Sequence, residues 1–225
     1  MDGLSLLKDL TENRDDARAD QMEAYMRDQF VFLGIPAEKR RKLMRPYFKE
    51  ARKEKHIDWT FVDNYWEQPY RECQYIVCDY LSAEQARLVP ADIDKLKTLV
   101  LKKAWWDTCD SLDKVIGKLA LDYPELNEIL LEWSQDEKIW LRRIAIDHQR
   151  HRKERTDTQL LETILKNNFG SSEFFINKAI GWILRDYSKT DPQWVTQFIE
   201  QHKAELHPLS IREGYKYLKS KNIKR

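Results

Sequence analysis

The sequence predicts an all-α protein built from repeated pairs of helices. Glycine is scarce, with six residues in a chain of 225, whereas an average protein contains about 7%. Strand-favouring runs of Val, Ile and Thr are also scarce, while Leu, Lys, Glu, Ala and Arg are abundant. Related segments recur about 35 residues apart, which is the period expected of a solenoid of paired helices.

Four segments mark the predicted repeats, and each is followed by a second amphipathic helix. They are Pro69–Cys78, Ala104–Lys118, Lys138–Ile146 and Glu173–Ile180. In a solenoid, one helix of each pair lines a concave surface, so matching positions in successive repeats come to face the same groove.

The residues between the repeats predict short turns. Pro124 and Pro192 stand where a first helical turn tolerates proline. Ser134–Glu137 and Ser210–Glu213 have the spacing of a capping box, which predicts helix starts at both serines. No Gly/Ser linker interrupts the sequence, so we expect residues 1–225 to form a single repeat domain.

Composition excludes several classes of protein. The three cysteines, Cys73, Cys78 and Cys109, are an odd number without paired spacing. No apolar run approaches the roughly 18 residues that a membrane span needs. Acidic residues interrupt the stretch Met1–Arg14 before a secretory signal could develop. We therefore expect a soluble, reduced, cytoplasmic protein, and a monomer.

The formal net charge of +1 argues against a protein that coats nucleic acid through bulk charge. Basic residues nevertheless gather in three clusters: Lys39–Lys55, Arg142–Arg155 and Lys216–Arg225. Any one cluster is explained by a solvated helix face. Their recurrence on separate predicted helices instead favours local anion binding.

The segment around Trp105-Trp106 predicts a site. On one helix, Lys102, Trp106 and Asp110 would lie four residues apart along a single face. An ionised carboxylate is costly in a core without a partner, so an exposed groove is the more natural setting.

Two further predicted helices carry similar stripes. The stripes are Lys178, Trp182 and Arg185 within 172–187, and Trp140, Arg143, Asp147 and Arg150 within 136–149. Together the three helices are expected to present aromatic rings, one carboxylate and several cations to one groove, where the cations would hold phosphates.

Other conspicuous residues are interpreted as structural. The remaining tryptophans are predicted to pack in the core: Trp59, Trp66, Trp105, Trp133 and Trp194. His148 and His151 have a helical spacing that a metal could use, but the surrounding arginines and Lys153 would repel a cation, so no metal is expected. No glycine-rich phosphate loop is present, and no cofactor is expected.

Several motifs give the chain a resemblance to a known family. They are Tyr25-Met26, Phe30–Ile35, Trp105–Ser111, Trp140–Arg143, Lys178–Tyr187 and Pro208–Arg212. In this order, and over nearly the whole chain, they resemble the bacterial DNA alkylation repair glycosylases of the AlkD type. Those enzymes are solenoids of HEAT-like repeats, so the resemblance implies a HEAT-like fold with a concave DNA-binding groove.

The resemblance also implies a reaction and a set of site residues. Members of the family hydrolyse the N-glycosidic bond of positively charged alkylated purines, chiefly 3-methyladenine and 7-methylguanine, in duplex DNA. By motif position, Asp110 would be the catalytic carboxylate, and Trp106 and Trp182 the aromatic walls. The residues expected to contact DNA are Arg143, Arg185, Lys178, Tyr25, Arg142 and Arg212. The phosphate role could fall on Arg142 or Arg143, and the Trp-Leu-x-Arg spacing favours Arg143.

These residue types suit that chemistry. A cationic purine leaves as a neutral base while positive charge develops on the deoxyribose. A carboxylate stabilises that charge, and each tryptophan face attracts a cation by about 0.5 to 2 kcal/mol. Selectivity for cationic lesions is expected, with salt-sensitive and largely sequence-independent binding. A groove without an evident pocket further predicts a reaction on the sugar without an enclosed, flipped base.

Two alternatives remain open. The same surface could belong to a non-catalytic HEAT-like module that binds DNA structures or a protein partner, because a fold alone does not define a function. A protein scaffold without a nucleic-acid role is the second alternative, which weak DNA affinity at modest salt would support.

Overall fold

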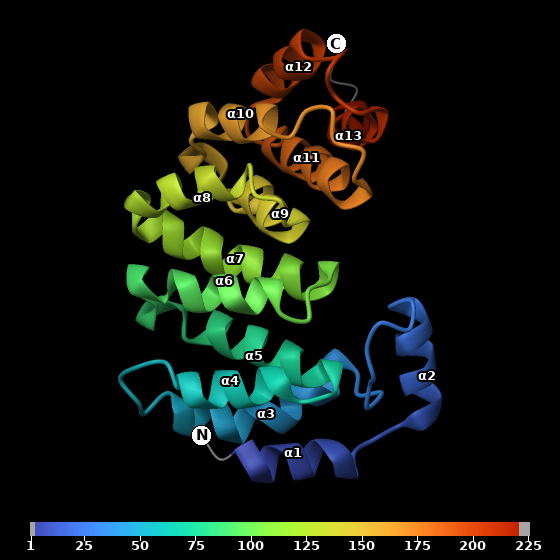
Figure 1. Ribbon diagram of the computed structural model, residues 1–225, viewed down its shortest axis with the longest axis vertical. Coiled ribbons are helices and arrows are strands. Elements are labelled where there is room, and N and C mark those ends of the chain that lie inside the picture. Colours follow the sequence, from blue (N-terminus) through green and yellow to red (C-terminus); the bar gives the residue numbers. More distant parts are fainter. Residues whose placement is uncertain (1–2, 221–225) are drawn as a thin grey trace. The chain divides into compact units, whose positions relative to one another are not determined.

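The computed structural model describes residues 3–220, and its regular structure is helical throughout (Figure 1). Fourteen α-helices and four short 3-10 helices follow one another, and residues 3–220 contain no strand beyond an isolated bridge between Val31 and Tyr70. The predicted all-α repeat class is confirmed. No helix in this part of the chain is both long and apolar enough to cross a membrane.

The chain forms two compact units, Met1–Val89 and Pro90–Arg225. In a repeat protein each element contacts mainly its neighbours, so such units occur inside one repeat domain as well as between two domains. The expectation of a single domain over residues 1–225 therefore stays a prediction. Residues 221–225, part of the third basic cluster, lie outside the described residues.

The first unit contains α1 to α5. Their bounds are α1 (Gly3–Glu12), α2 (Asp16–Tyr25), α3 (Ala37–Ala51), α4 (Trp59–Glu67) and α5 (Arg71–Ala83). Helix α1 packs on α3, and both α3 and α4 pack on α5. The buried carboxylate of Glu72 accepts hydrogen bonds from the backbone N–H groups of Leu33, Gly34 and Ile35, at 3.0, 2.9 and 3.1 Å. This carboxylate fixes the segment between α2 and α3.

The second unit contains the remaining helices. Their bounds are α6 (Ile93–Leu101), α7 (Trp106–Asp122), α8 (Asn127–Trp133), α9 (Ile139–Asp147), α10 (Thr158–Lys166), α11 (Phe174–Tyr187), α12 (Pro192–Gln201), α13 (Pro208–Gly214) and α14 (Lys216–Ser220). Helix α7 packs on α9, α9 on α11, and α11 on α13, while α6 packs against α7 and α9, and α8 against α9 (Figure 1). Alternate helices therefore stack on one another, as in a helical repeat.

Two glycines allow the closest approaches within this stack. A Cβ at Gly117 would lie 2.1 Å from the carbonyl oxygen of His148, so α7 touches the backbone that follows α9. A Cβ at Gly181 would lie 2.4 Å from the Cβ of Glu213, which brings α13 directly onto α11. Any side chain at either position would separate these elements.

The prediction that Lys102, Trp106 and Asp110 share one helix face is wrong for Lys102. Helix α6 ends at Leu101, and Lys103 adopts a left-handed backbone conformation with φ of 53°. Helix α7 begins only at Trp106, so Lys102 belongs to the preceding connection. Trp106 and Asp110 do share one face of α7.

The predicted helix starts are partly confirmed. Pro124 begins a 3-10 helix, and Pro192 is the first residue of α12. Both capping boxes are wrong, because Ser134 caps the C-terminus of α8 and Ser210 lies inside α13. The His207 side chain caps α13 instead, where it accepts a hydrogen bond from the backbone N–H of Leu209.

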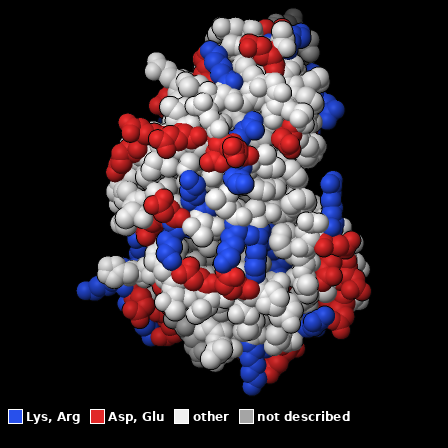
Figure 2. All heavy atoms as spheres, viewed as in Figure 1, with Lys and Arg blue, Asp and Glu red and all other residues white. Residues whose placement is uncertain are grey.

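Among the tryptophans predicted to pack in the core, Trp66 and Trp133 are fully buried. Trp59, Trp105 and Trp194 are only half-buried, because each lies at or near a helix start. Figure 2 shows Lys and Arg side chains close to Asp and Glu side chains on the face viewed, without a large surface of one sign. This mixture agrees with the small net charge.

Candidate active site

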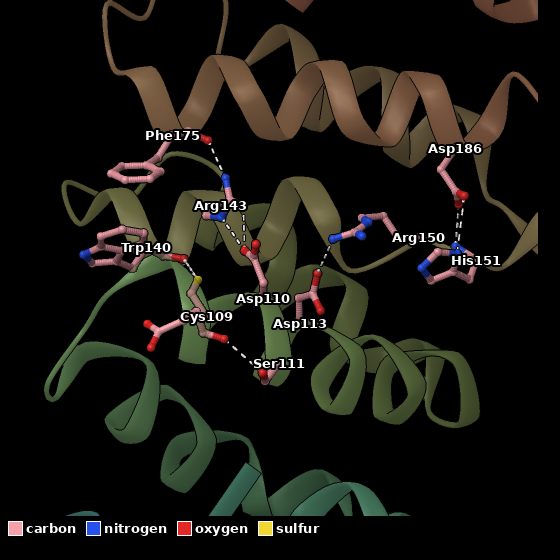
Figure 3. Close-up of polar contacts among 11 residues, drawn as sticks. Cys109, Asp110, Ser111, Asp113, Trp140, Arg143, Arg150, His151, Phe175 and Asp186 are labelled. Carbon is pink, nitrogen blue, oxygen red and sulfur yellow. Dashed lines mark hydrogen bonds and ion pairs between the residues drawn. The ribbon is translucent and has the colours of Figure 1, made fainter. Parts of the chain in front are cut away.

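An ion pair between Asp110 on α7 and Arg143 on α9 lies at the centre of the candidate site (Figure 3). Arg143 Nε donates a hydrogen bond to Asp110 Oδ1 at 2.7 Å, and Arg143 Nη2 lies 2.6 Å from the same oxygen. Arg143 Nη1 donates to the backbone carbonyl of Phe175 on α11, at 2.7 Å. The Arg143 side chain is 2% exposed and the Asp110 side chain 17%. The pair therefore turns its carboxylate toward solvent.

Trp182 on α11 completes this group. The guanidinium carbons of Arg143 and Arg150 each lie 5.2 Å from the Trp182 ring centroid, and Lys178 Nζ lies 5.9 Å from it. Such distances allow cation–π attraction. The three predicted stripes on α7, α9 and α11 thus converge, as the repeat pattern suggested.

An aromatic cluster borders the ion pair on its Phe175 side. Ring centroids of Trp105, Trp140 and Phe175 lie 5.1 to 5.8 Å apart. The thiol of Cys109 donates to the Trp140 carbonyl at 3.6 Å. The sequence interpretation treated Trp105 as core and did not assign Phe175, in a mostly apolar row of the predicted helix 172–187, to the site. Its position directly before the Lys178–Trp182 stripe was the available signal.

A second ion pair repeats the first, one turn further along α7. Arg150 Nη1 donates to Asp113 Oδ2 at 3.1 Å. Asp113 is 3% exposed and Arg150 18%, so here the guanidinium faces solvent. Asp147, the last residue of α9, is 1% exposed, and neither of its carboxylate oxygens has a hydrogen-bond partner within the described residues.

Burial and ion pairing oppose each other in these acids. Burial raises the pKa of Asp110, and the charge of Arg143 acts in the opposite direction. Burial raises the pKa of Asp147 to about 7 despite the nearby Arg143 and Arg150. Burial would lower the pKa of Arg143, but the carboxylates of Asp147 and Asp110 outweigh it and raise that pKa. Arg143 therefore stays charged.

Glu213 on α13 forms ion pairs with the two cationic residues that flank Trp182 on α11, and with Lys216. This carboxylate is 2% exposed and lies 3.0 Å from Lys178 Nζ, 3.3 Å from Arg185 Nη1 and 2.6 Å from Lys216 Nζ. Lys178 and Arg185 stand one turn before and one turn after Trp182 on α11. Sequence reasoning missed Glu213, because only the close contact at Gly181 brings it onto α11.

The other predicted site residues differ in burial and in position on their helices. Trp106 is half-buried at the start of α7. Arg142 Nε donates to Asn168 Oδ1 at 2.8 Å, so Arg143 is the arginine of the pair that reaches Asp110. Arg212 is exposed on α13, and Tyr25 is 71% exposed at the end of α2 in the first unit. Contacts of all these residues with DNA stay predictions.

A cleft of about 300 Å³ adjoins the second ion pair. Its walls include Asp113, Lys118, Asp147, Arg150 and Arg155. The loop on one side is strained, with left-handed φ values of 66° at His151 and 54° at Lys153. Asp186 Oδ2 accepts from the His151 backbone N–H at 2.7 Å and so holds this loop on α11.

Neither histidine of this region is arranged as a metal ligand. Burial lowers the pKa of His148 to about 3, so its ring is neutral, while His151 lies 3.3 Å from Asp186. Across residues 3–220, no group of three or more His, Cys, Asp or Glu side chains is arranged to hold a metal ion.

Comparison with known proteins identifies a sequence family and a similar solved structure. Residues 6–218 match the sequence profile of the family described as DNA alkylation repair enzyme. A solved structure described as a predicted DNA alkylation repair enzyme from Enterococcus faecalis is 35% identical, with a TM-score of 0.85. The similarity covers 91% of this chain and 96% of that one. No curated protein matches.

Proposed function

The chain belongs to the DNA alkylation repair enzyme family, and from this premise we propose that it is a DNA glycosylase. Its substrates are positively charged alkylated purines in duplex DNA, such as 3-methyladenine and 7-methylguanine, and it hydrolyses their N-glycosidic bond. It acts as a monomer in base excision repair. One observation carries the proposal: the partly exposed carboxylate of Asp110 is fixed by Arg143 beside Trp182.

Asp110 supplies the negative charge that the reaction needs. Both contacts from Arg143 use Oδ1, so Oδ2 is left for the substrate. The departing base is already cationic and needs little acid catalysis, whereas the deoxyribose gains positive charge in the transition state. A carboxylate held in advance stabilises that charge more than it stabilises the ground state, and it can orient the attacking water.

Arg143 prepares the carboxylate for this role. Its positive charge favours the ionised form of Asp110 against the effect of burial on the pKa. Its third contact, to the carbonyl of Phe175, prevents the guanidinium from swinging away. Arg143 therefore favours the ionised form of Asp110 and fixes the orientation of its carboxylate.

Trp182 and the surrounding cations bind the DNA. Trp182, with Trp106 as a second wall, attracts the cationic sugar and base through their aromatic faces. Lys178 and Arg185 hold the phosphate backbone, aided by Arg142 or Arg143 and by Tyr25 and Arg212. Lys178 and Arg185 are already paired with Glu213, so a phosphate competes with a carboxylate for them. Binding is expected to weaken steeply with salt.

The test is release of base from duplex DNA that contains 7-methylguanine. The parent protein and Asp110→Asn are compared on this substrate, on undamaged DNA and on DNA with uracil, a neutral lesion. Release from 7-methylguanine alone, lost in the variant, supports the proposal. Salt-sensitive DNA binding without release by the parent would instead indicate a non-catalytic DNA-binding repeat protein.

A further inference from the structure

Five charged side chains form one connected cluster beneath the proposed active site. Three are carboxylates, from Asp110, Asp113 and Asp147, and two are guanidinium groups, from Arg143 and Arg150. They come from α7, α9 and the turn after α9. If all five were ionised, the cluster would hold one negative charge in excess.

The hydrogen bonds show which carboxylate receives no hydrogen bond from an arginine. Arg143 donates to Asp110, and Arg150 donates to Asp113. Asp147 stands four residues after Arg143 and three before Arg150, but neither arginine turns to it. Both of its oxygens are buried and have no hydrogen-bond partner in the described part of the chain.

An ionised carboxylate in this position is unfavourable. It would lose its hydration without gaining a direct partner, and such a group retains a proton instead. Asp147 also lines the cleft beside Arg150, which gives water and protons a route to it. Burial raises the pKa of Asp147 to about 7, in agreement with this geometry.

We propose that Asp147 is a positioning residue that holds a proton. Its neutral side chain then does not compete with the Asp110 carboxylate for the guanidinium of Arg143. When Asp147 loses this proton to water, its new charge attracts Arg143 away from Asp110. The carboxylate that faces the substrate then loses its orientation. This inference rests on the proposed function, and it adds a buried acid whose protonation state controls the central ion pair.

The groups around Asp147 favour this assignment over one to Asp113. Asp147 faces Arg143 and Arg150 from its own segment, and it also faces acids from α7 and α11. These acids are Asp110 and Asp113 on α7 and Asp186 on α11, which is itself held by His151 and Lys189. Burial and the charge of Asp147 also raise the pKa of Asp113 well above its ordinary value, so the two acids compete for one proton. The hydrogen bonds distinguish them, because Asp113 Oδ2 accepts from Arg150, whereas neither oxygen of Asp147 has a partner among the described residues. This geometry assigns the proton to Asp147, and a neutral-range titration of the Asp113 carboxyl in its place would overturn the assignment.

The first experiment needs no DNA and no activity. Carbon-13 NMR follows the Asp side-chain carboxyl resonances of the parent protein from about pH 4 to about pH 9. The Asp147 carboxyl, assigned through its bonds to the backbone, is expected to titrate near neutral pH. In the matched variant Asp113→Asn the Asp147 carboxyl should still titrate, shifted to lower pH by the loss of a repelling carboxylate, whereas in Asp147→Asn this titration should be absent. Titration of Asp147 below about pH 5 would overturn the proposal.

The second experiment asks whether the proton matters for the reaction. Single-turnover base release is measured from about pH 6 to about pH 9, a range that spans the pKa of about 7 for Asp147. The rate of the parent is expected to fall about tenfold over this range, as expected for a group that titrates near neutral pH. In Asp147→Asn, which keeps the neutral form, this fall should disappear.

The two proposals fail in different ways. A parent that releases no base at any pH refutes the glycosylase, while the NMR titration still decides where the proton lies. An active parent whose alkaline decline persists in a folded Asp147→Asn refutes the role of Asp147 and leaves the glycosylase intact.

Discussion

Two Asp–Arg pairs of the second unit, Asp110–Arg143 and Asp113–Arg150, use the same residue types in opposite ways. In the Asp110–Arg143 pair the carboxylate is the more exposed member, at 17% against 2%. In the Asp113–Arg150 pair the guanidinium is the more exposed member, at 18% against 3%. The first pair offers a negative oxygen to whatever binds, and the second offers a positive group. The chemical role of such a pair therefore depends on which of its two members is exposed to solvent.

The positions of the arginines explain this inversion. Arg143 lies within α9, under the Phe175 carbonyl that it contacts, so its guanidinium is enclosed. Arg150 lies in the turn after α9, on the wall of the cleft. On α7 the order is reversed, because Asp113 is closer than Asp110 to the tight contact at Gly117.

The largest difference between the pairs should appear in catalysis. Asp110→Asn removes the exposed charge but keeps its shape, and we expect base release from 7-methylguanine DNA to fall by about 100-fold or more. Asp113→Asn, the matched change in the second pair, should lower it by less than about tenfold. The readout is the single-turnover rate at saturating protein. Equal losses in the two variants would break the comparison.

The next difference concerns stability. Arg143→Met leaves the mostly buried Asp110 without a partner, which should cost about 3 to 5 kcal/mol of unfolding free energy. Arg150→Met also removes the partner of a buried carboxyl, Asp113, which is 3% exposed. The pKa of Asp113 is raised well above its ordinary value, so this acid can take up a proton when Arg150 is lost, and we expect a smaller cost of about 1 to 2 kcal/mol. Urea denaturation of both variants at neutral pH measures these costs. If Arg150→Met lowers the free energy of unfolding more than Arg143→Met does, burial of the arginine does not explain the difference in stability between the two pairs.

The acid between the two pairs predicts a pH dependence of stability. The pKa of Asp147 is about 7 in the folded protein against 3.8 for an ordinary aspartate. The folded state therefore holds the proton more tightly, and the free energy of unfolding should fall as pH rises from about 4 to about 7. A fall of about 2 to 4 kcal/mol is expected from this group. Urea titrations at several pH values should show a smaller fall in Asp147→Asn.

The smallest effect is expected in DNA binding. Arg150→Gln removes one exposed guanidinium, so affinity for duplex DNA should decrease by about threefold to tenfold. The slope of log affinity against log salt should decrease by about one. Fluorescence anisotropy over a range of salt concentrations measures both. Lys118→Gln, on the same cleft, is a control for loss of a positive charge elsewhere, and an unchanged slope in Arg150→Gln would argue against a phosphate at this pair.

Local spacing explains why much of the site could be predicted. The positions of Asp110, Arg143 and Trp182 on their helices follow from the helical period, and the repeat length brings those helices into contact. Lys102 was misplaced because nothing in the sequence marks Lys103 as left-handed. The predicted roles in catalysis and DNA binding follow from the family resemblance and stay predictions.

Tertiary contacts explain what the sequence did not reveal. Glu213 meets Lys178 and Arg185 only because Gly181 lets α13 approach α11. The direction of Arg143 toward the Phe175 carbonyl likewise depends on how three helices pack, as does the absence of a hydrogen-bond partner for Asp147 among residues 3–220. Periodicity places a residue on a helix face, but it does not indicate which neighbour its side chain selects.

The burial of the cysteines has a consequence for a protein of this family. The agents that methylate DNA are electrophiles, and in proteins their most reactive targets are thiolates. All three cysteines are buried, and burial raises the pKa of the Cys109 thiol well above its ordinary value. Cys109, one residue from Asp110, is therefore kept as an unreactive thiol. We expect the protein to withstand the same chemical exposure that creates the lesions it repairs.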